Sequence, residues 1–215
     1  MEDKKFALCH VDAQYLRFLR SSDSRISQKN NRPFLAFAVY INEQHYAIPI
    51  TSQTFRLNKD GIEDKTLRRN PQSTDEIKVG NNYYGAILHN NMIPIHESLI
   101  QIIDIDNESA IEQSRLLPKV QFIRKHFDDI VKKSNKVYDI VTKEKRPFFV
   151  KFCCDFEKLE KQLKEYCILL GIGISPSEEE KLQEPPILDK LADCTNRSEQ
   201  TKSNNDIEKT YEFSR

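Results

Sequence analysis

The chain has 215 residues, of which 38% are hydrophobic and 31% are charged, and its formal net charge is zero. This composition suits one ordinary domain with a polar surface. It excludes a membrane protein, because no apolar run approaches the about 20 residues that cross a bilayer. The acidic residues near the N-terminus also argue against a secretion signal, so we expect a soluble protein of the cytoplasm.

The first half of the chain is predicted to form strands. Residues 6–11, "FALCHV", read as a strand, and a short helix follows with Asp12 as its N-cap. Residues 32–41 and 45–50, "RPFLAFAVYI" and "HYAIPI", predict a β-hairpin. Residues 56–82 are polar, with Gly and Pro, and predict a long surface loop. After this loop, "YYGAILH", "MIPI" and "LIQIID" predict two or three more strands.

The second half is predicted to be helical, because the hydrophobic period changes from two to three or four after Asn107. Residues 109–134 carry one apolar stripe, in which Pro118 is expected to restart or kink the helix. "NKVYDIVTK" predicts a second short helix, and "DFEKLEKQLKEYCILL" predicts a third that Asp155 caps. Strands followed by helices predict an α+β fold. We expect a compact, strongly bent antiparallel sheet, a partly closed barrel, with helices added on one side.

The zero net charge hides an uneven distribution. Residues 175–215 contain six basic and ten acidic residues, a net of −4, so residues 1–174 carry +4. The C-terminal segment has few large apolar residues, and we expect residues 1–174 to form the domain and 175–215 a mostly disordered, acidic tail. Residues 113–151 hold eleven basic and four acidic residues, a net of +7. Such a segment is either a solvated helix face or an RNA-binding surface, which would include Lys119, Arg124 and Lys125.

Cysteine and histidine spacing indicates neither a metal site nor a cofactor. The five cysteines form no CxxC pair and are an odd number, so we expect reduced thiols in the core. The five histidines show no HxxxH or HExxH spacing. His10 and Asp12 lie two residues apart at the end of the first strand, where His10 is either a proton shuttle or, more commonly, a surface residue.

Two adjacent hydroxyl residues, Thr51 and Ser52, end the second strand of the hairpin, and Arg56 and Lys59 follow them. Hydroxyl side chains at the end of a strand commonly satisfy the backbone amides of a turn. Beside basic residues they can also bind phosphate. Serine has too high a pKa to be an efficient general base, so the functional alternative is that Ser52 holds a phosphate or a leaving oxygen.

Several segments occur in an order that resembles a known family. They are a strand leading into a helix that carries Tyr15, then "NRPFLAFAVYI", "YAIPITS", "NNMIPI" and "LLPKVQFIRKHFDDIVKKS". Together they resemble the ToxN/AbiQ family, the endoribonuclease toxins of type III toxin–antitoxin systems, over residues 5–168. The ordered set carries the resemblance, since each segment alone is a weak signal.

The resemblance implies a sheet like that of the Kid and MazF toxins and metal-independent cleavage of single-stranded, adenine-rich RNA. It implies a part in phage defence by abortive infection. It also implies inhibition by a small repeated RNA pseudoknot, which the toxin excises from a precursor and with which it assembles into a closed hetero-oligomer. The family positions with counterparts here are Tyr15, Arg32, Thr51, Ser52, Gln121 and Phe122.

One departure from the family concerns Thr54, which stands where the family commonly has lysine. We expect Arg32, Arg56 or Lys59 to supply the positive charge, or cleavage to be weaker than in relatives. The alternative is a noncatalytic RNA-binding module that uses the same basic helical face.

RNA carries its own nucleophile, the 2′-hydroxyl, so an enzyme can cut it without a metal or a covalent intermediate. The expected products are a 2′,3′-cyclic phosphate and a 5′-hydroxyl. In this interpretation Ser52 binds the phosphate or the leaving oxygen, Thr51 holds the turn, and Arg32 or Arg56 faces the phosphoryl oxygens. Tyr15 stacks a base or bridges to phosphate.

Overall fold

The computed structural model describes residues 6–172, except residues 27, 30, 54 and 65–68. The predicted tail, residues 175–215, lies outside the described residues. The strands are β1 (Ala7–Val11), β2 (Phe34–Ile41), β3 (Gln44–Thr51), β4 (Arg56–Leu57), β5 (Glu63–Asp64), β6 (Thr74–Val79), β7 (Asn82–Leu88), β8 (Ile93–Ile95) and β9 (Ile100–Ile102). The helices are α1 (Ala13–Ser22), α2 (Ala110–Lys125), α3 (Phe127–Thr142), α4 (Pro147–Phe152) and α5 (Phe156–Leu169).

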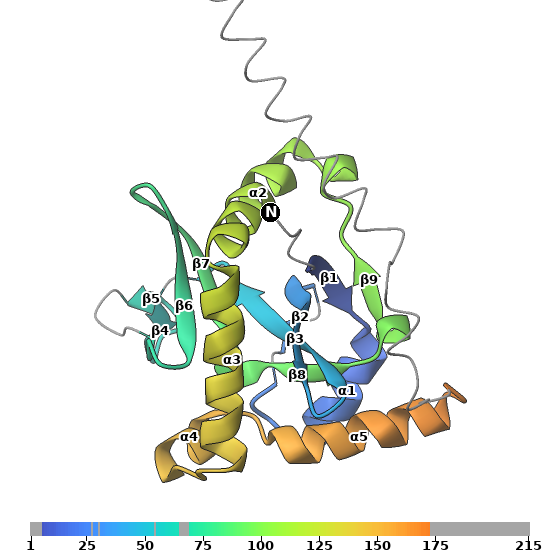
Figure 1. Ribbon diagram of the computed structural model, residues 1–215. Coiled ribbons are helices and arrows are strands. Elements are labelled where there is room, and N and C mark those ends of the chain that lie inside the picture. The colour runs from blue at the N-terminus through green and yellow to red at the C-terminus, as the bar shows by residue number, and fades with distance from the viewer. Residues whose placement is uncertain (1–5, 27, 30, 54, 65–68, 173–215) are drawn as a thin grey trace, which may run out of the picture. The chain divides into compact units, whose positions relative to one another are not determined.

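Seven strands form one antiparallel sheet in the order β6-β7-β3-β2-β1-β9, with β8 also paired to β3 (Figure 1). The strand β3 has two partners along the same edge: its first half pairs with β8, and its last residues, Ile50 and Thr51, pair with β7. A bulge in β2 shifts the register between Leu35 and Val39, and Phe37 there adopts a φ of +63°.

The α+β class and the bent antiparallel sheet are confirmed, but the sheet does not close into a barrel. Among the described strands, β6 and β9 end the sheet and do not pair with each other. The β6–β7 hairpin extends the sheet beyond β3 and leaves it open. The expected likeness to the Kid and MazF toxins is therefore not confirmed.

Helices α3 and α5 are joined to the sheet by a partly buried cluster of hydrogen-bonded side chains. Helix α3 packs on β2, and α5 packs on β8 and α1 (Figure 1). The hydroxyls of Tyr46 and Tyr138 both donate to Oε1 of Glu160, at 2.6 and 2.9 Å. Phe156 lies beside both rings and is fully buried. One carboxylate thus links β3, α3 and α5 through the core.

Helix α2 continues through Pro118, so the expected restart of the helix there is wrong. Leu116 and Val120 on either side of the proline are buried, and this packing compensates for the loss of one amide hydrogen bond. The chain instead changes direction at His126, between α2 and α3 (Figure 1). The short helix predicted over "NKVYDIVTK" is part of α3.

The prediction of a long loop over residues 56–82 is wrong in part, because this segment contains β6 and the small β4–β5 ladder. In β6, Ile77 is fully buried, while charged Asp75, Glu76 and Lys78 surround it in sequence. Edge strands commonly carry such charges. A search for apolar runs therefore does not detect these strands.

The described cysteines are free and buried: Cys9, Cys153, Cys154 and Cys167. Burial raises the pKa of Cys9 and of Cys153 to about 12, so these thiols stay protonated near neutral pH. The fifth cysteine, Cys194, lies outside the described residues. No helix within the described ranges has the length and apolar character to cross a membrane.

Candidate active site

A cleft of about 990 Å³ opens where the end of β3 and the start of β7 face α2. It collects side chains from segments that are far apart in the sequence, including several of the predicted site residues. The residues lining the cleft are His10, Lys29, Asn31, Arg32, Pro33, Ile50, Thr51, Ser52, Tyr83, Tyr84, Ile103, Glu108, Glu112, Arg115, Leu116 and Lys119.

The turn after β3 presents Ser52 to this cleft. Thr51 is buried, and its Oγ1 accepts a hydrogen bond from the backbone N–H of Gln53 at 3.2 Å. Arg69 closes the turn from outside by donating to the backbone carbonyls of Gln53 and Phe55, each at 3.2 Å. Thr51 therefore holds the turn, as expected, while Ser52 remains exposed.

Gly85 on β7 allows the backbone of the turn to approach closely. Its φ is +120°, and a Cβ at this position would lie 1.7 Å from the carbonyl oxygen of Thr51. Any other residue would push the turn away from β7. The position of Ser52 thus depends on a glycine more than thirty residues later in the chain.

Two basic side chains of the cleft are partly withdrawn from water. Burial lowers the pKa of Arg32, and the nearby Arg69 guanidinium lowers it further. Only 5% of Lys119 is exposed. Burial lowers the pKa of Lys119 as well, an effect that Glu112 opposes and Arg115 reinforces. Such cations bind an anion more strongly than fully solvated ones, because water screens them less.

His10 is the only histidine among the described residues that line the cleft. It is half-buried, and its Nδ1 is a buried atom with no hydrogen-bond partner within the part of the chain described. Asp12 does not serve as its partner, because the Asp12 carboxylate accepts the backbone N–H of Tyr15 at 2.7 Å and caps α1. Asp12 therefore does not orient the His10 ring, although His10 lines the cleft.

The role expected of Tyr15 is wrong. Its side chain is fully buried, its hydroxyl donates to the carbonyl of Pro94 at 2.8 Å, and its ring packs 5.1 Å from that of Tyr166. No face of this ring is open to a base, and the hydroxyl already has its acceptor. Tyr15 is a core residue that joins α1 to β8 and α5.

Of the side chains predicted to bind RNA, only Lys119 lines the cleft. Arg56 and Lys59 are exposed outside it, on β4 and in the turn that follows. Phe122 packs 4.5 Å from the ring of His126. Residues two positions apart on a helix point about 200° away from each other, so Gln121 leaves α2 on the side opposite Lys119. Contacts of these residues, and of Arg124 and Lys125, with RNA stay predictions.

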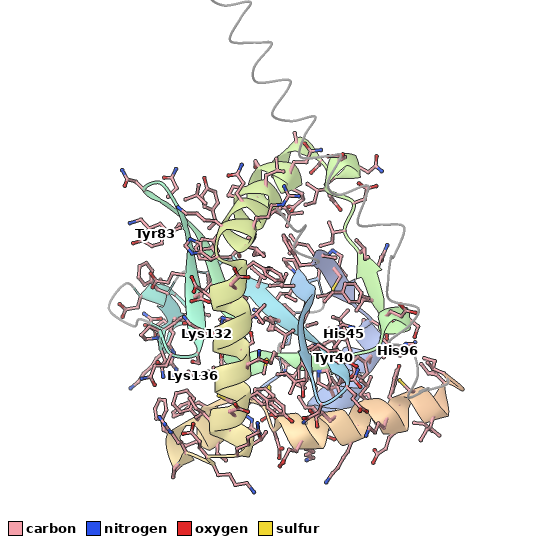
Figure 2. The ribbon with its side chains drawn as sticks, in the orientation of Figure 1. Tyr40, His45, Tyr83, His96, Lys132 and Lys136 are labelled. Carbon is pink, nitrogen blue, oxygen red and sulfur yellow. The ribbon has the colours of Figure 1, made fainter. Side chains whose placement is uncertain are left out.

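The basic segment 113–151 does not form a single surface. Lys133 joins a cluster with Asp75 and His89. Three other cations form local ion pairs: Arg115 with Glu112, Lys143 with Asp139 and Arg146 with Glu144. Two lysines, Lys132 and Lys136, lie exposed along α3 (Figure 2).

Several cleft residues were missed or given little weight: His10, Lys29, Asn31, Tyr83, Tyr84 and Arg115. For Arg115 a signal existed, since it lies four residues before Lys119 and shares its helix face. For the tyrosines there was none, because they reach the cleft only through the pairing of β7 with β3. No three His, Cys, Asp or Glu side chains of the described segments are grouped as metal ligands.

Comparison with known proteins identifies relatives over the described domain. The profile of the family "Toxin ToxN, type III toxin-antitoxin system" matches residues 7–164. The chain is 29% identical over 168 residues to the endoribonuclease ToxN of Bacillus thuringiensis subsp. kurstaki, covering 73% of this chain and 81% of the relative. It is 25% identical over 162 residues to the endoribonuclease AbiQ of Lactococcus lactis subsp. lactis, covering 73% and 86%.

Solved structures agree with the sequence matches. One belongs to a study of selective toxin inhibition by a non-coding RNA pseudoknot in type III toxin–antitoxin systems. It superposes with a TM-score of 0.65 at 27% identity, over 75% of this chain and 98% of the other. The structure of AbiQ, a lactococcal anti-phage endoribonuclease, superposes with a TM-score of 0.66 at 24% identity, over 76% and 99%, and so shares the fold.

Proposed function

The chain belongs to the ToxN family of type III toxin–antitoxin systems, and on this premise we propose that it is an endoribonuclease toxin whose activity an RNA antitoxin suppresses. The observation that carries the proposal is that Ser52, Arg32 and Lys119 line one cleft. The substrate is single-stranded RNA rich in adenine, and the protein acts in the cytoplasm, where such RNA occurs.

In the proposed reaction, the 2′-oxygen of one nucleotide attacks the adjacent phosphorus. The bond from phosphorus to O2′ forms, and the bond to O5′ breaks. His10 takes the proton of the 2′-hydroxyl, because imidazole exchanges protons near neutral pH. The Lys119 ammonium gives a proton to the leaving O5′, and the products are a 2′,3′-cyclic phosphate and a 5′-hydroxyl.

The remaining cleft residues bind and orient the phosphate. The Ser52 hydroxyl donates to a phosphoryl oxygen, and Arg32 neutralises the charge that grows on these oxygens in the transition state. Lys119 also compensates for the lysine that the family has at the position of Thr54, which lies outside the described residues. No step requires a metal ion, since the RNA supplies the nucleophile and the protein supplies the cations.

The partner of the toxin is a small, repeated RNA that folds as a pseudoknot. It occupies the same cleft, is excised there from its precursor, and closes with the protein into a hetero-oligomer. Release of the toxin during phage infection would then stop growth of the infected cell. The support is the family membership together with a cleft lined by four cations, Lys29, Arg32, Arg115 and Lys119, against Glu108 and Glu112, a net of +2.

A cleavage assay tests the proposal. Purified protein is incubated with an end-labelled, adenine-rich RNA in the presence of EDTA. We expect cutting by the parent, and a loss on the order of 100-fold in rate for Ser52→Ala and for Lys119→Gln. The control is Lys136→Gln, an exposed lysine on α3 that does not line the cleft, and this variant is expected to cut like the parent.

Two results would contradict the proposal. If the parent leaves the RNA intact but binds it in a salt-sensitive way, the protein is a noncatalytic RNA-binding module instead. If Ser52→Ala cuts as fast as the parent, the reaction does not take place in this cleft. Growth of cells that express the protein gives a parallel readout, since the parent should arrest growth unless its RNA partner is coexpressed.

A further inference from the structure

Tyr83, near the start of β7, is an exposed aromatic side chain in the cleft. It is 45% exposed, and it lines the same cavity as Ser52. Figure 2 shows it on the β6–β7 hairpin, to one side of α3. An exposed tyrosine ring presents a flat apolar face and a polar hydroxyl. Beside the candidate active site, this face is available to a ligand that has an apolar face of its own.

A β-bulge brings Tyr83 to the cleft. In the β6–β7 ladder Ile77 opposes Gly85, but the next residue, Lys78, opposes Tyr83, so Tyr84 is an extra residue in β7. In a regular strand, neighbouring side chains point to opposite faces. The bulge breaks this alternation, and both tyrosines line the cleft.

The surroundings of the ring suit a nucleobase. The Nζ of Lys78 lies 5.3 Å from the centre of the Tyr83 ring, and the ring of Phe55 lies 6.4 Å away at a tilt of 49°. Proteins grip single-stranded RNA with aromatic rings for the bases and with neighbouring cations for the phosphates. This cluster has both components.

The distance from the reaction centre also suits a base next to the cut. The backbone of Gly85 touches the Thr51–Ser52 turn, and Tyr83 precedes Gly85 by two residues. Two residues of a strand span at most about 7 Å. A base bound on Tyr83 would therefore belong to a nucleotide adjacent to the phosphate held at Ser52.

We propose that Tyr83 is the stacking platform for this nucleobase, with Lys78 beside the neighbouring phosphate. The inference rests on the proposed function, because it assumes that RNA enters the cleft. It takes over the role that the sequence assigned to Tyr15, and it adds a contact that positions the strand for cleavage.

The test is a double-mutant cycle between the protein and the RNA. The variants are Tyr83→Ala, Tyr83→Phe and, as a control, Tyr40→Ala, since Tyr40 is 47% exposed but does not line the cleft. The substrates carry one abasic nucleotide at each position around the cut. Cleavage is measured as KM and kcat, and binding is measured with the same RNAs in a Ser52→Ala background.

We expect Tyr83→Ala to raise KM and Kd by about 5- to 100-fold, as for loss of one stacked base. Tyr83→Phe and Tyr40→Ala should remain near the parent. At one position, an abasic nucleotide should raise the Kd of the RNA for the parent protein. The same abasic nucleotide should leave the Kd for Tyr83→Ala unchanged, because the stacking contact is already lost. Thermal unfolding of each variant verifies that the hairpin is intact.

Two results would overturn the inference. One is that the abasic nucleotide and Tyr83→Ala raise Kd independently, so that their effects add at every position. The other is that Tyr83→Ala binds the intact RNA as tightly as the parent does. Failure of the parent to cut RNA is a different result, which contradicts the proposed function. The binding cycle still decides the stacking in that case, because it does not depend on cleavage.

Discussion

Gly85 controls the position of Ser52 at the level of a single residue. A side chain there would meet the carbonyl of Thr51 and would require a positive φ. We expect Gly85→Ala to lower the free energy of unfolding by about 1–3 kcal/mol and to slow cleavage on the order of 100-fold, because a small displacement of a binding group costs that much.

Gly80 is the matched control for this prediction, measured by urea unfolding and RNA cleavage. It also has a positive φ, +60°, but a Cβ there would meet nothing within 4 Å. Gly80→Ala should lower stability through backbone strain and leave the cleavage rate intact. Equal losses of activity in both variants would show that contact with Thr51 is not the cause.

His89 makes the stability of the domain depend on pH. It is fully buried, with Ser134 at Nδ1 and Asp75 at Nε2, each at 2.8 Å, and Asp75 also contacts Lys133. Burial lowers the pKa of His89, although Asp75 opposes the shift. Between that lowered pKa and the ordinary value of about 6.5, the unfolded chain binds more protons than the folded one. The free energy of unfolding should therefore fall as the pH drops below about 6.5.

Urea unfolding at a series of pH values between 7.5 and 5 tests this prediction. The parent should lose stability across this range, and His89→Gln, although less stable at pH 7.5, should lose less of its stability on acidification. At still lower pH, the free energy of unfolding of both proteins should fall further because of Asp75. Burial alone would raise the pKa of Asp75, but its hydrogen bonds from His89 and Lys133 lower it overall, so its stabilising contribution is lost below about pH 4. The same slope between pH 7.5 and 5 in both proteins would refute the role of His89.

At the scale of elements, Glu160 joins β3, α3 and α5 by accepting hydrogen bonds from Tyr46 and Tyr138. We expect Glu160→Ala to destabilise the fold by about 1–3 kcal/mol, because the buried Tyr46 hydroxyl loses its acceptor. Glu165→Ala, on the exposed side of α5, should cost little. In the Tyr46→Phe background the effect of Glu160→Ala should shrink, and an unchanged effect measured by urea unfolding would contradict the link.

The elements that sequence reasoning predicted well are those with local signals. Strands β1, β2 and β3 have β-branched and aromatic runs, and α1 and α5 begin at the expected caps, Asp12 and Asp155. Strand β6 was not predicted, because charged residues surround Ile77 in the sequence. The end of α2 at His126 was not predicted either, since no Gly or Pro marks it.

The candidate site divides in the same way. Ser52, Thr51 and Arg32 line the cleft, and they could be predicted as candidates because they belong to contiguous segments that resemble the family. Gly85, Arg69 and Tyr83 were not, since each acts on the turn or the cleft through strand pairing or loop contacts. Tyr15 was misassigned because its helical spacing fits a core residue as well as a ligand-binding one, and only burial distinguishes the two.

At the scale of the whole molecule, the excess of positive charge in residues 113–151 matters less than its distribution. Of the basic residues in that segment, only Lys119 and Arg115 line the cleft, and Arg115 is paired with Glu112. Others pair with carboxylates elsewhere or lie along α3. The described domain therefore gathers cations from distant segments in one cleft, where β3, β7 and α2 meet.

The most direct test of RNA cleavage at this cleft replaces one 2′-hydroxyl of the substrate by hydrogen. A short RNA is cut in EDTA, the cut position is mapped, and the nucleotide that would supply the attacking oxygen is changed to its 2′-deoxy form. The account predicts that cutting at that position stops, that binding to Ser52→Ala is unchanged by the substitution, and that the unmodified RNA yields a 2′,3′-cyclic phosphate. Cutting of the 2′-deoxy substrate at the same bond would contradict it.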